Sequence, residues 1–290
     1  MALQEAIWRN IGDEKLKNVD DKVVKAFGEE WDSYNQSPLK EEEAKDLFNR
    51  YFNIFPSNFL QDDKVGIDFG CGSGRWAKHI APLVKELHCV DASKKALNVA
   101  RNNLDSFDNC IFTHATTDAL GSLDQQFDFG YSVGVLHHIP DTKKALIDCI
   151  AVLKVGSPFL LYLYFAFDNK PLWYRIFWKI SEPIRFIISR SSFPVRKFIT
   201  SLIALLIYLP FSRLALIFDK LGIHSENIPL SAYKNRSFYS MRTDALDRFG
   251  TRLEQRFTKK EIYSMMIDAG LTNIEFSKDI PFWTALGYKK

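Results

Sequence analysis

The 290-residue sequence has few cysteines, no internal repeat and no low-complexity tract. Cys71, Cys89, Cys110 and Cys149 are far apart and form no Cys-x-x-Cys or Cys/His pair, which excludes a disulfide framework and a metal site of zinc-finger type. Each cysteine lies in or beside an expected apolar element, so we expect buried, reduced thiols. Residues 1–10 lack the basic start and apolar core of a signal peptide. Together these features predict a cytoplasmic protein without a metal.

Strong charge of either sign is also missing. The net charge is only +3, which is too small to indicate a nucleic-acid partner. Apolar residues make up 47% of the chain and charged residues 25%, which is typical of a globular protein. The length predicts one large domain, or one domain with a sizeable insertion.

Short apolar runs alternate with helical patterns through the first half of the chain. Strands are expected at 64–69, 86–91, 110–114, 127–133 and 158–165. Helices are expected at 74–83, 93–104 and 141–153. Such alternation predicts a parallel, doubly wound α/β sheet. The pattern stops at Asp168 and resumes with a helix at 258–269, which Gly270 should end, and closing strands at 271–277 and 281–288.

The most informative motif lies where the first strand ends. Val65–Gly74 is an apolar run with an acid, Asp68, followed by glycines at 70, 72 and 74, and the second strand ends in Asp91. A dinucleotide fingerprint would place a glycine where Arg75 stands. The motif instead resembles motif I of the class I S-adenosylmethionine-dependent methyltransferases. The resemblance extends over about 60–165 and 243–288. Within the class, the sequence is most similar to the small-molecule type 11/12 branch.

That resemblance implies a mostly parallel, seven-stranded sheet and S-adenosylmethionine as cofactor, with S-adenosylhomocysteine as product. The N–H groups of Gly70–Gly74 would take the methionine carboxylate, Asp68 the amino group and Asp91 the ribose hydroxyls. Asp118 would accept from the adenine amine, or would only cap a helical turn. The cofactor-binding residues expected are Asp68, Gly70, Cys71, Gly72, Gly74, Asp91, Ala92, Thr117, Asp118, Ala119 and Val133.

The fourth strand leads into Ser132–Asp141, which resembles motif IV of small-molecule methyltransferases. The Asn/Asp-Pro-Pro-aromatic motif of enzymes that methylate nucleobase amines is absent, which argues against DNA methylation. His137 and His138 are candidates for a general base, because imidazole titrates near neutral pH. The alternative is a structural role in which the rings bond to nearby backbone.

Substrate contacts are expected from three segments. Trp31 and Tyr34 share a helical face with Phe27 and form a lid over the cofactor, or simply pack a helix on the sheet. Tyr162 and Tyr164 share one face of the fifth strand and line the substrate site or fill the core. Tyr239, Arg242 and Asp247 lie in an aspartate-containing segment that would pass over the active site before a capping box at Thr258–Glu261, unless they are solvated loop residues.

We expect three regions: a helical lid segment at 1–62, a cofactor-binding core at 63–167 and 243–290, and a helical insertion at 168–242 that covers the substrate. The insertion holds 12 Lys or Arg and 4 Asp or Glu, so its charge is +8 and the remainder carries −5. Its uncharged stretch at 198–212 has 15 residues, fewer than the roughly 20 of a membrane span. Pro210 and Arg213 also argue against a span.

Two interpretations of the insertion remain open. It is a lid or interaction helix over an apolar pocket, or a helix on an anionic membrane surface at 170–220 that gives peripheral association. Nucleic acid does not fit so much aliphatic surface. The predicted activity is methyl transfer to an oxygen or nitrogen of a small amphipathic, lipid-linked or glycan-type acceptor. The alternatives are a membrane-surface binding protein without methyl transfer and a protein methyltransferase.

Overall fold

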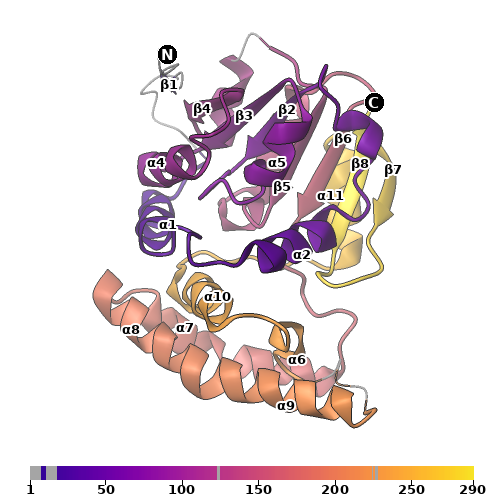
Figure 1. Ribbon diagram of the computed structural model, residues 1–290. Helices are drawn as coiled ribbons and strands as arrows, with labels where there is room; N and C mark the ends of the chain where they lie inside the picture. Colours follow the sequence, from indigo (N-terminus) through magenta and orange to yellow (C-terminus); the bar gives the residue numbers. More distant parts are fainter. Residues whose placement is uncertain (1–7, 11–17, 123–124, 224, 226–227) are drawn as a thin grey trace. The chain divides into compact units, whose positions relative to one another are not determined.

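The computed structural model describes residues 8–10, 18–122, 125–223, 225 and 228–290 (Figure 1). The chain divides into two compact units. The first comprises 1–37, 44–166 and 255–290, and the second comprises 38–43 and 167–254. The predicted insertion at 168–242 falls in the second unit, together with residues 243–254. The roles assigned to these regions from the sequence stay predictions.

The first unit is built on one sheet with the strand order β1-β4-β3-β2-β5-β6-β8-β7. The strands are β1 Trp8–Asn10, β2 Val65–Phe69, β3 Glu86–Asp91, β4 Cys110–His114, β5 Phe129–Val133, β6 Pro158–Tyr162, β7 Leu271–Phe276 and β8 Thr284–Lys289. Strands β1 to β6 pair in parallel, and β8 pairs antiparallel with both β6 and β7. The predicted mostly parallel, doubly wound sheet is confirmed, with all seven expected strands.

The eighth strand, β1, was not expected, because residues 1–62 were predicted to be helical. Its three residues pair in parallel with β4, so Trp8 lies level with Phe112. The pairing uses backbone groups that the edge of β4 would otherwise leave open. A three-residue edge strand has too little sequence pattern to be recognised, since its position is fixed by the neighbouring strand.

Helices of the first unit begin and end close to the predicted positions. They are α1 Asp21–Ser33, α2 Glu41–Phe52, α3 Ala77–Ile80, α4 Lys94–Asn103, α5 Thr142–Ala151 and α11 Lys259–Asp268, with 3₁₀ turns η1 Ser57–Phe59, η2 Ala81–Leu83, η3 Thr117–Ser122 and η4 Leu136–His138. The first three residues of α2 belong to the second unit. Ser93 caps α4, Asp141 caps α5, and Thr258 with Glu261 forms the expected capping box.

One predicted stop signal acts differently. Helix α5 ends at Ala151 rather than Leu153, and Gly156, which was expected to close it, lies in the turn before β6 with φ +82°. That turn needs a left-handed residue, which glycine adopts without strain. Gly270 does follow α11 directly, as predicted, with φ +89°.

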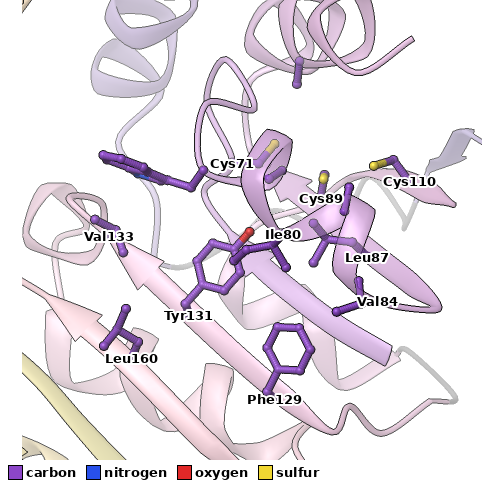
Figure 2. Packing of buried hydrophobic residues seen from close by; sticks show 14 of the residues in the cluster. Cys71, Ile80, Val84, Leu87, Cys89, Cys110, Phe129, Tyr131, Val133 and Leu160 are labelled. Atoms are coloured by element: carbon purple, nitrogen blue, oxygen red, sulfur yellow. The ribbon is translucent and has the colours of Figure 1, made fainter. Parts of the chain in front are cut away.

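Both faces of the sheet are buried. One face packs Phe129, Tyr131 and Leu160 with Ile80 of α3 and Leu97 of α4 (Figure 2). The other packs side chains of alternate strand positions against α5 and α11. All four cysteines are free and buried, as predicted. Three of them, Cys71, Cys89 and Cys110, belong to the first of these clusters.

The second unit is helical. Its helices are α6 Leu172–Ile180, α7 Glu182–Ile188, α8 Phe193–Ile203, the π-helical turn η5 Ala204–Tyr208, α9 Leu209–Lys220, the 3₁₀ turn η6 Ser231–Tyr233, and α10 Phe238–Gly250. It has a small core of its own, formed by Ile188, Ala204, Tyr208, Met241, Ala245 and Phe249. Helix α6 ends at Ile180 and α7 begins at Glu182, with Pro183 in its first turn.

Two features of this unit add to what the sequence predicted. Pro210, which argued against a membrane span, lies within a continuous helix, just after the π-helical turn Ala204–Tyr208. Phe193–Lys220 is therefore one continuous helix of 28 residues, long and apolar enough to cross a membrane by length and composition alone. The stretch at 237–249, for which a segment over the active site and a solvated loop were the alternatives, forms the helix α10, with Ser237 as its N-cap.

Candidate active site

The carboxyl ends of the parallel strands bring the predicted cofactor residues together. In the sheet, Asp68 lies level with Cys89 of β3 and with Tyr131 of β5. The loops that follow β2, β3, β4 and β5 therefore leave the sheet at one edge, which is where open α/β sheets bind ligands. All eleven residues predicted to bind the cofactor lie on these strand ends or loops, within the first unit.

The loop after β2 forms a tight backbone cradle, but most of its N–H groups are not free, contrary to the prediction. Those of Gly70 and Cys71 donate to the carbonyl of Val90, and that of Gly74 donates to the carbonyl of Cys71. Gly70, Gly72 and Gly74 have φ of +80°, +55° and +76°. A Cβ on Gly72 would lie 2.9 Å from the indole of Trp31. A side chain at this position would therefore strain the backbone, because φ is positive, and would also clash with Trp31. Arg75, at the position of the missing third glycine, places its guanidinium carbon 4.3 Å from the ring of Trp76 and 5.5 Å from that of Trp31.

Asp91 joins the ends of β2 and β3. Its Oδ2 accepts from the N–H of Gly72 at 2.9 Å, and its Oδ1 accepts from the N–H of Ser93 at 2.8 Å. Each carboxylate oxygen keeps a further lone pair for a ligand hydroxyl. Burial raises the pKa of Asp91, while the N–H groups of Ser93 and Gly72 act in the opposite direction. The arrangement fits two vicinal ribose hydroxyls.

Asp68 is buried in the apolar layer beneath this loop. Its side chain is 1% exposed, and its Oδ2 has no hydrogen-bond partner among the described residues. Burial raises its pKa to about 8, although the nearby hydroxyl of Tyr131 acts in the opposite direction. The Tyr131 hydroxyl, also buried, lacks a partner in the same part of the structure. A cationic group of a ligand would be stabilised here by an ionised Asp68.

The sequence did not point to Tyr131. The signal was present, because Tyr131 lies two residues before Val133, and alternation places both side chains on one face of β5. The register then puts Tyr131 beside Asp68.

Helix α1 lies across these loops and contacts α4 (Figure 1). A Cβ on Gly28 of α1 would lie 2.5 Å from Oγ of Ser93, the N-cap of α4. Phe27 packs against His138 with ring centroids 4.7 Å apart. Trp31 is partly buried against Gly72, whereas Tyr34 is 3% exposed. Trp31 is therefore in place to contact a cofactor, and Tyr34 packs in the interior.

A residue that the sequence did not indicate, Asn18, fastens the start of α1. Its backbone N–H donates to Oδ2 of Asp118 at 3.3 Å. Its side chain pairs with the backbone of Asp141, donating to the carbonyl at 2.9 Å and accepting from the N–H at 2.8 Å. Asn18 thus links the loops after β4 and β5. Asp118 also accepts from Oγ1 of Thr116 at 2.6 Å, so its carboxylate already serves the protein.

The two histidines lie in the 3₁₀ turn after β5, and both are buried. Nδ1 of His137 accepts from the backbone N–H of Tyr164 at 3.4 Å, which favours the tautomer with the proton on Nε2. The ring stacks on Tyr164 with centroids 3.9 Å apart. Burial, His138 and Arg256 lower the pKa of His137 well below its ordinary value. His137 is therefore neutral and, in this tautomer, a donor rather than a base.

The aromatic residues after β6 adjoin this turn. The guanidinium carbon of Arg256 lies 5.0 Å from the centroid of Tyr164, and its Nη1 donates to the carbonyl of Phe165 at 3.2 Å. Tyr162 is 8% exposed and packs edge-on against Tyr51 at 4.9 Å, which is core packing. Tyr239, Arg242 and Asp247 lie on α10 of the second unit, where Nε of Arg242 donates to Oγ of Ser201 at 3.3 Å.

Comparison with known proteins agrees with this geometry. Residues 67–161 match the family model described as a methyltransferase domain. The chain is 32% identical over 108 residues to the uncharacterised methyltransferase YcgJ of Bacillus subtilis (strain 168), covering 37% of this chain and 43% of that protein. It is 32% identical over 92 residues to a ubiquinone biosynthesis O-methyltransferase of Roseobacter denitrificans, covering 31% and 37%.

The fold is also similar to that of a solved structure, human N-acetylserotonin methyltransferase in complex with S-adenosylmethionine. The TM-score is 0.52 at 14% identity, covering 92% of this chain and 57% of that one. The matched segment is thus similar to a methyltransferase domain, and it contains the loop after β2, Asp91 and the turn after β5. The chain spans only about two fifths of the length of the two curated relatives.

Proposed function

We propose that this protein transfers a methyl group from S-adenosylmethionine to an oxygen or nitrogen of a small amphipathic or lipid-linked acceptor. The observation that carries the proposal is the linked pair of Asp91 and the Gly70–Gly74 loop. Asp91 holds the backbone of Gly72 and Ser93 while each of its oxygens keeps a lone pair. One carboxylate therefore orders the loop and remains able to receive the ribose.

The residues of the site would each hold one part of the cofactor. The backbone of the Gly70–Gly74 loop would face the carboxylate, although four of its N–H groups already donate within the protein, and Asp68 would take the amino group. Thr117, Asp118 and Ala119 of η3 would contact the adenine, and Trp31 would close over Gly72. When bound, S-adenosylmethionine supplies a methyl carbon on positively charged sulfur. The acceptor's lone pair forms the new bond to that carbon as the carbon–sulfur bond breaks, and the electron pair stays on sulfur.

The two histidines are the candidates for contacting the acceptor's reacting group. In the tautomer that the Tyr164 bond favours, Nε2 of His137 carries a hydrogen and would donate to the acceptor, which positions it without removing its proton. His138 is the remaining candidate for a base, and its ring lies 4.0 Å from that of His137. Tyr164, stacked on His137, would line the acceptor site. Tyr239, Arg242 and Asp247 stay candidates for binding the acceptor's polar end.

The chemical class of the acceptor rests on the second unit and on the relatives. A relative is named for O-methylation in ubiquinone biosynthesis. The second unit exposes apolar and basic side chains, which suit an acceptor drawn from an anionic membrane surface. We propose a cytoplasmic enzyme that associates peripherally with such a surface through residues 170–220.

Methyl transfer from radiolabelled S-adenosylmethionine into separated lipid and aqueous extracts of the source cells tests the proposal. Label in the lipid fraction, lost with Asp91→Ala, is expected. Label only in the aqueous fraction would contradict the lipid-linked acceptor, and label in protein would identify a protein methyltransferase. Tight cofactor binding with no label in any fraction would indicate a membrane-surface binding protein that keeps the fold without transfer.

A further inference from the structure

The exposed apolar side chains of this protein are gathered in one segment. Of the 24 large hydrophobic residues exposed in the described part of the chain, 19 lie between Leu172 and Ile223. The other five are Leu83, Ile147, Val155, Tyr263 and Ile267. Single exposed apolar residues need no explanation, but a contiguous set of this size marks an interaction surface.

The long helix Phe193–Lys220 turns small and polar side chains inward and large apolar side chains outward, the opposite of a surface helix in a water-soluble protein. Its buried stripe recurs at every third or fourth residue and consists of Arg196, Thr200, Ala204, Tyr208, Ser212 and Ala215. Its exposed side carries Phe198, Leu202, Leu205, Leu206, Phe211 and Ile217. A surface helix in water turns its apolar side inward. Small and polar residues between helices, with aliphatic residues outside, are the arrangement of helices packed in lipid.

The inward polar groups of this helix have partners within the second unit. Nη1 of Arg196 donates to the carbonyl of Gly250 at 2.9 Å. Oγ1 of Thr200 donates to the carbonyl of Arg196 at 2.8 Å, and Oγ of Ser212 to that of Leu209 at 2.9 Å. Arg196 therefore bonds to the end of α10, whereas Thr200 and Ser212 bond to carbonyls of their own helix, and the exposed side of the helix is the one left for a partner.

Helices α6 and α7 also expose large apolar side chains. Leu172, Trp173, Ile176, Phe177 and Ile180 of α6 are at least half exposed, and no residue of α6 is buried. Basic residues accompany them: Arg175, Lys179, Arg190 and Lys220 are exposed. Long basic side chains can reach headgroups while neighbouring apolar side chains enter the acyl region.

We infer that helices α6 to α9 dock in the plane of an anionic lipid bilayer, with Phe198, Leu202 and Leu206 in the acyl boundary and with both helix ends on the same side. The inference rests on the membrane contact included in the proposed function and specifies its mode. A second copy of the chain is a poorer occupant, because each copy would bring a segment of charge +8 to the interface. Anionic headgroups complement that charge.

An in-plane position follows from the contacts of the long helix. The guanidinium of Arg213 donates to the carbonyl of Lys234 at 2.8 Å, and Arg196 to that of Gly250. A transmembrane position would take these arginines and the charged helix α10 into hydrocarbon. Only 15 residues separate Lys197 from Arg213, about 22 Å of helix against a core of about 30 Å.

Cosedimentation of the full chain with vesicles tests the docking. Vesicles of phosphatidylcholine with 30% phosphatidylglycerol should bind the protein at least about tenfold more tightly than phosphatidylcholine alone. Phe198→Asp and Leu206→Asp should each weaken binding about tenfold or more, because each places a charge in the acyl boundary. The matched control is Val155→Asp, which is exposed in the first unit and should bind like the unaltered protein.

Far-ultraviolet circular dichroism reports whether the helical second unit of each variant keeps its fold, and calorimetry reports whether the cofactor site of the first unit is intact. Leu206→Asp should bind S-adenosylmethionine normally, since its side chain is 67% exposed. If the unaltered protein binds vesicles but transfers no label to lipid, the docking stands and the proposed lipid-linked acceptor is contradicted. Absence of vesicle binding, or a dimer in lipid-free solution that Leu206→Asp dissociates, would overturn the docking.

Labelling with a membrane-impermeant maleimide tests the orientation. The four native cysteines are buried, so cysteines introduced as Ser192→Cys and Lys220→Cys report the two ends of the helix. Protein added to sealed vesicles should label fully at both positions from outside. Protection of one end only, released by detergent, would establish a transmembrane helix and overturn the in-plane position.

Discussion

At the scale of single residues, the site depends on carboxylates that serve the protein and a ligand together. Asp91 and Asp118 both accept hydrogen bonds from the chain before any ligand arrives. Asp68 differs, because it is buried and its Oδ2 has no partner among the residues described. Burial raises the pKa of Asp68 and the pKa of Asp91, and at Asp91 the backbone N–H donors oppose this rise.

Asp91→Ala should weaken S-adenosylmethionine binding by about 3 kcal/mol, or about 100-fold, because two charge-assisted hydrogen bonds to the ribose are lost and the Gly72 loop is released. Isothermal titration calorimetry measures the change. Asp105→Ala, at an exposed acid, is the control and should bind normally. Equal affinity in Asp91→Ala and Asp105→Ala would rule out the ribose contact.

Cofactor binding at pH 7 should release protons. Because the unliganded pKa of Asp68 is about 8, the carboxyl is mostly protonated at pH 7, and a bound ammonium group favours its ionised form. The pKa therefore falls on binding, and affinity should rise with pH up to about 8 and then level off. Calorimetry in two buffers of different ionisation enthalpy counts the protons.

The control for this experiment is Asp68→Asn, which cannot ionise at this position. The binding enthalpy of this variant should depend less on the buffer than that of the unaltered protein. The number of protons released on binding should be smaller by up to about one. Identical proton release in both proteins would show that Asp68 does not face the cofactor's charge.

At the scale of elements, the loop after β2 and helix α1 are fitted to one another. Gly72 adopts φ +55° directly beneath Trp31, and Asn18 fastens the start of α1 to the loops after β4 and β5. A short loop and a distant helix thus share one surface. A side chain added at Gly72 must displace Trp31.

Gly72→Ala should lower cofactor affinity at least about tenfold and cost about 1 kcal/mol or more in stability, from its positive φ and the contact with Trp31. Gly156→Ala is the matched control: its φ is +82° but nothing lies within 4 Å of the added Cβ. It should lose stability alone. Denaturant unfolding and calorimetry separate the two effects, and a Gly72→Ala protein that matched Gly156→Ala in affinity would argue against the cradle.

At the scale of the whole molecule, charge is unevenly distributed. The net charge of +3 combines +8 in residues 168–242 with −5 elsewhere. The basic segment belongs to the helical second unit, which also holds most of the exposed apolar side chains. Apolar insertion and electrostatic attraction therefore act through one unit, while the cofactor site is built by the other.

Binding to anionic vesicles should weaken as salt rises from about 0.1 M to 1 M, because the Debye length falls from about 10 Å to about 3 Å. A residual affinity should remain at high salt, since apolar insertion is not screened. Cosedimentation across a salt series measures both parts, and neutral vesicles provide the control. Complete release from anionic vesicles at 1 M salt would mean that the apolar surface does not enter the bilayer.

Much of the first unit was predictable because its signals are local. Apolar runs that end in acids or glycines place β2, β3 and their loops, and the caps Ser93, Asp141 and Thr258 mark helix starts through bonds to residues three positions away. Other features depend on neighbours distant in sequence. Asn18 reaches residues 118 and 141, and β1 takes its place from β4.

The sequence by itself determined the order of strands and helices, the cofactor loop and the acids at the strand ends, because each follows from periodicity or spacing within about twenty residues. The tertiary structure decided what these groups experience. Burial raises the pKa of Asp68, although Tyr131 acts in the opposite direction. The backbone N–H of Tyr164 favours one tautomer of His137. It also decided which side of Phe193–Lys220 faces outward, since an apolar helix reveals its buried stripe only when its packing partner, α10, is in place.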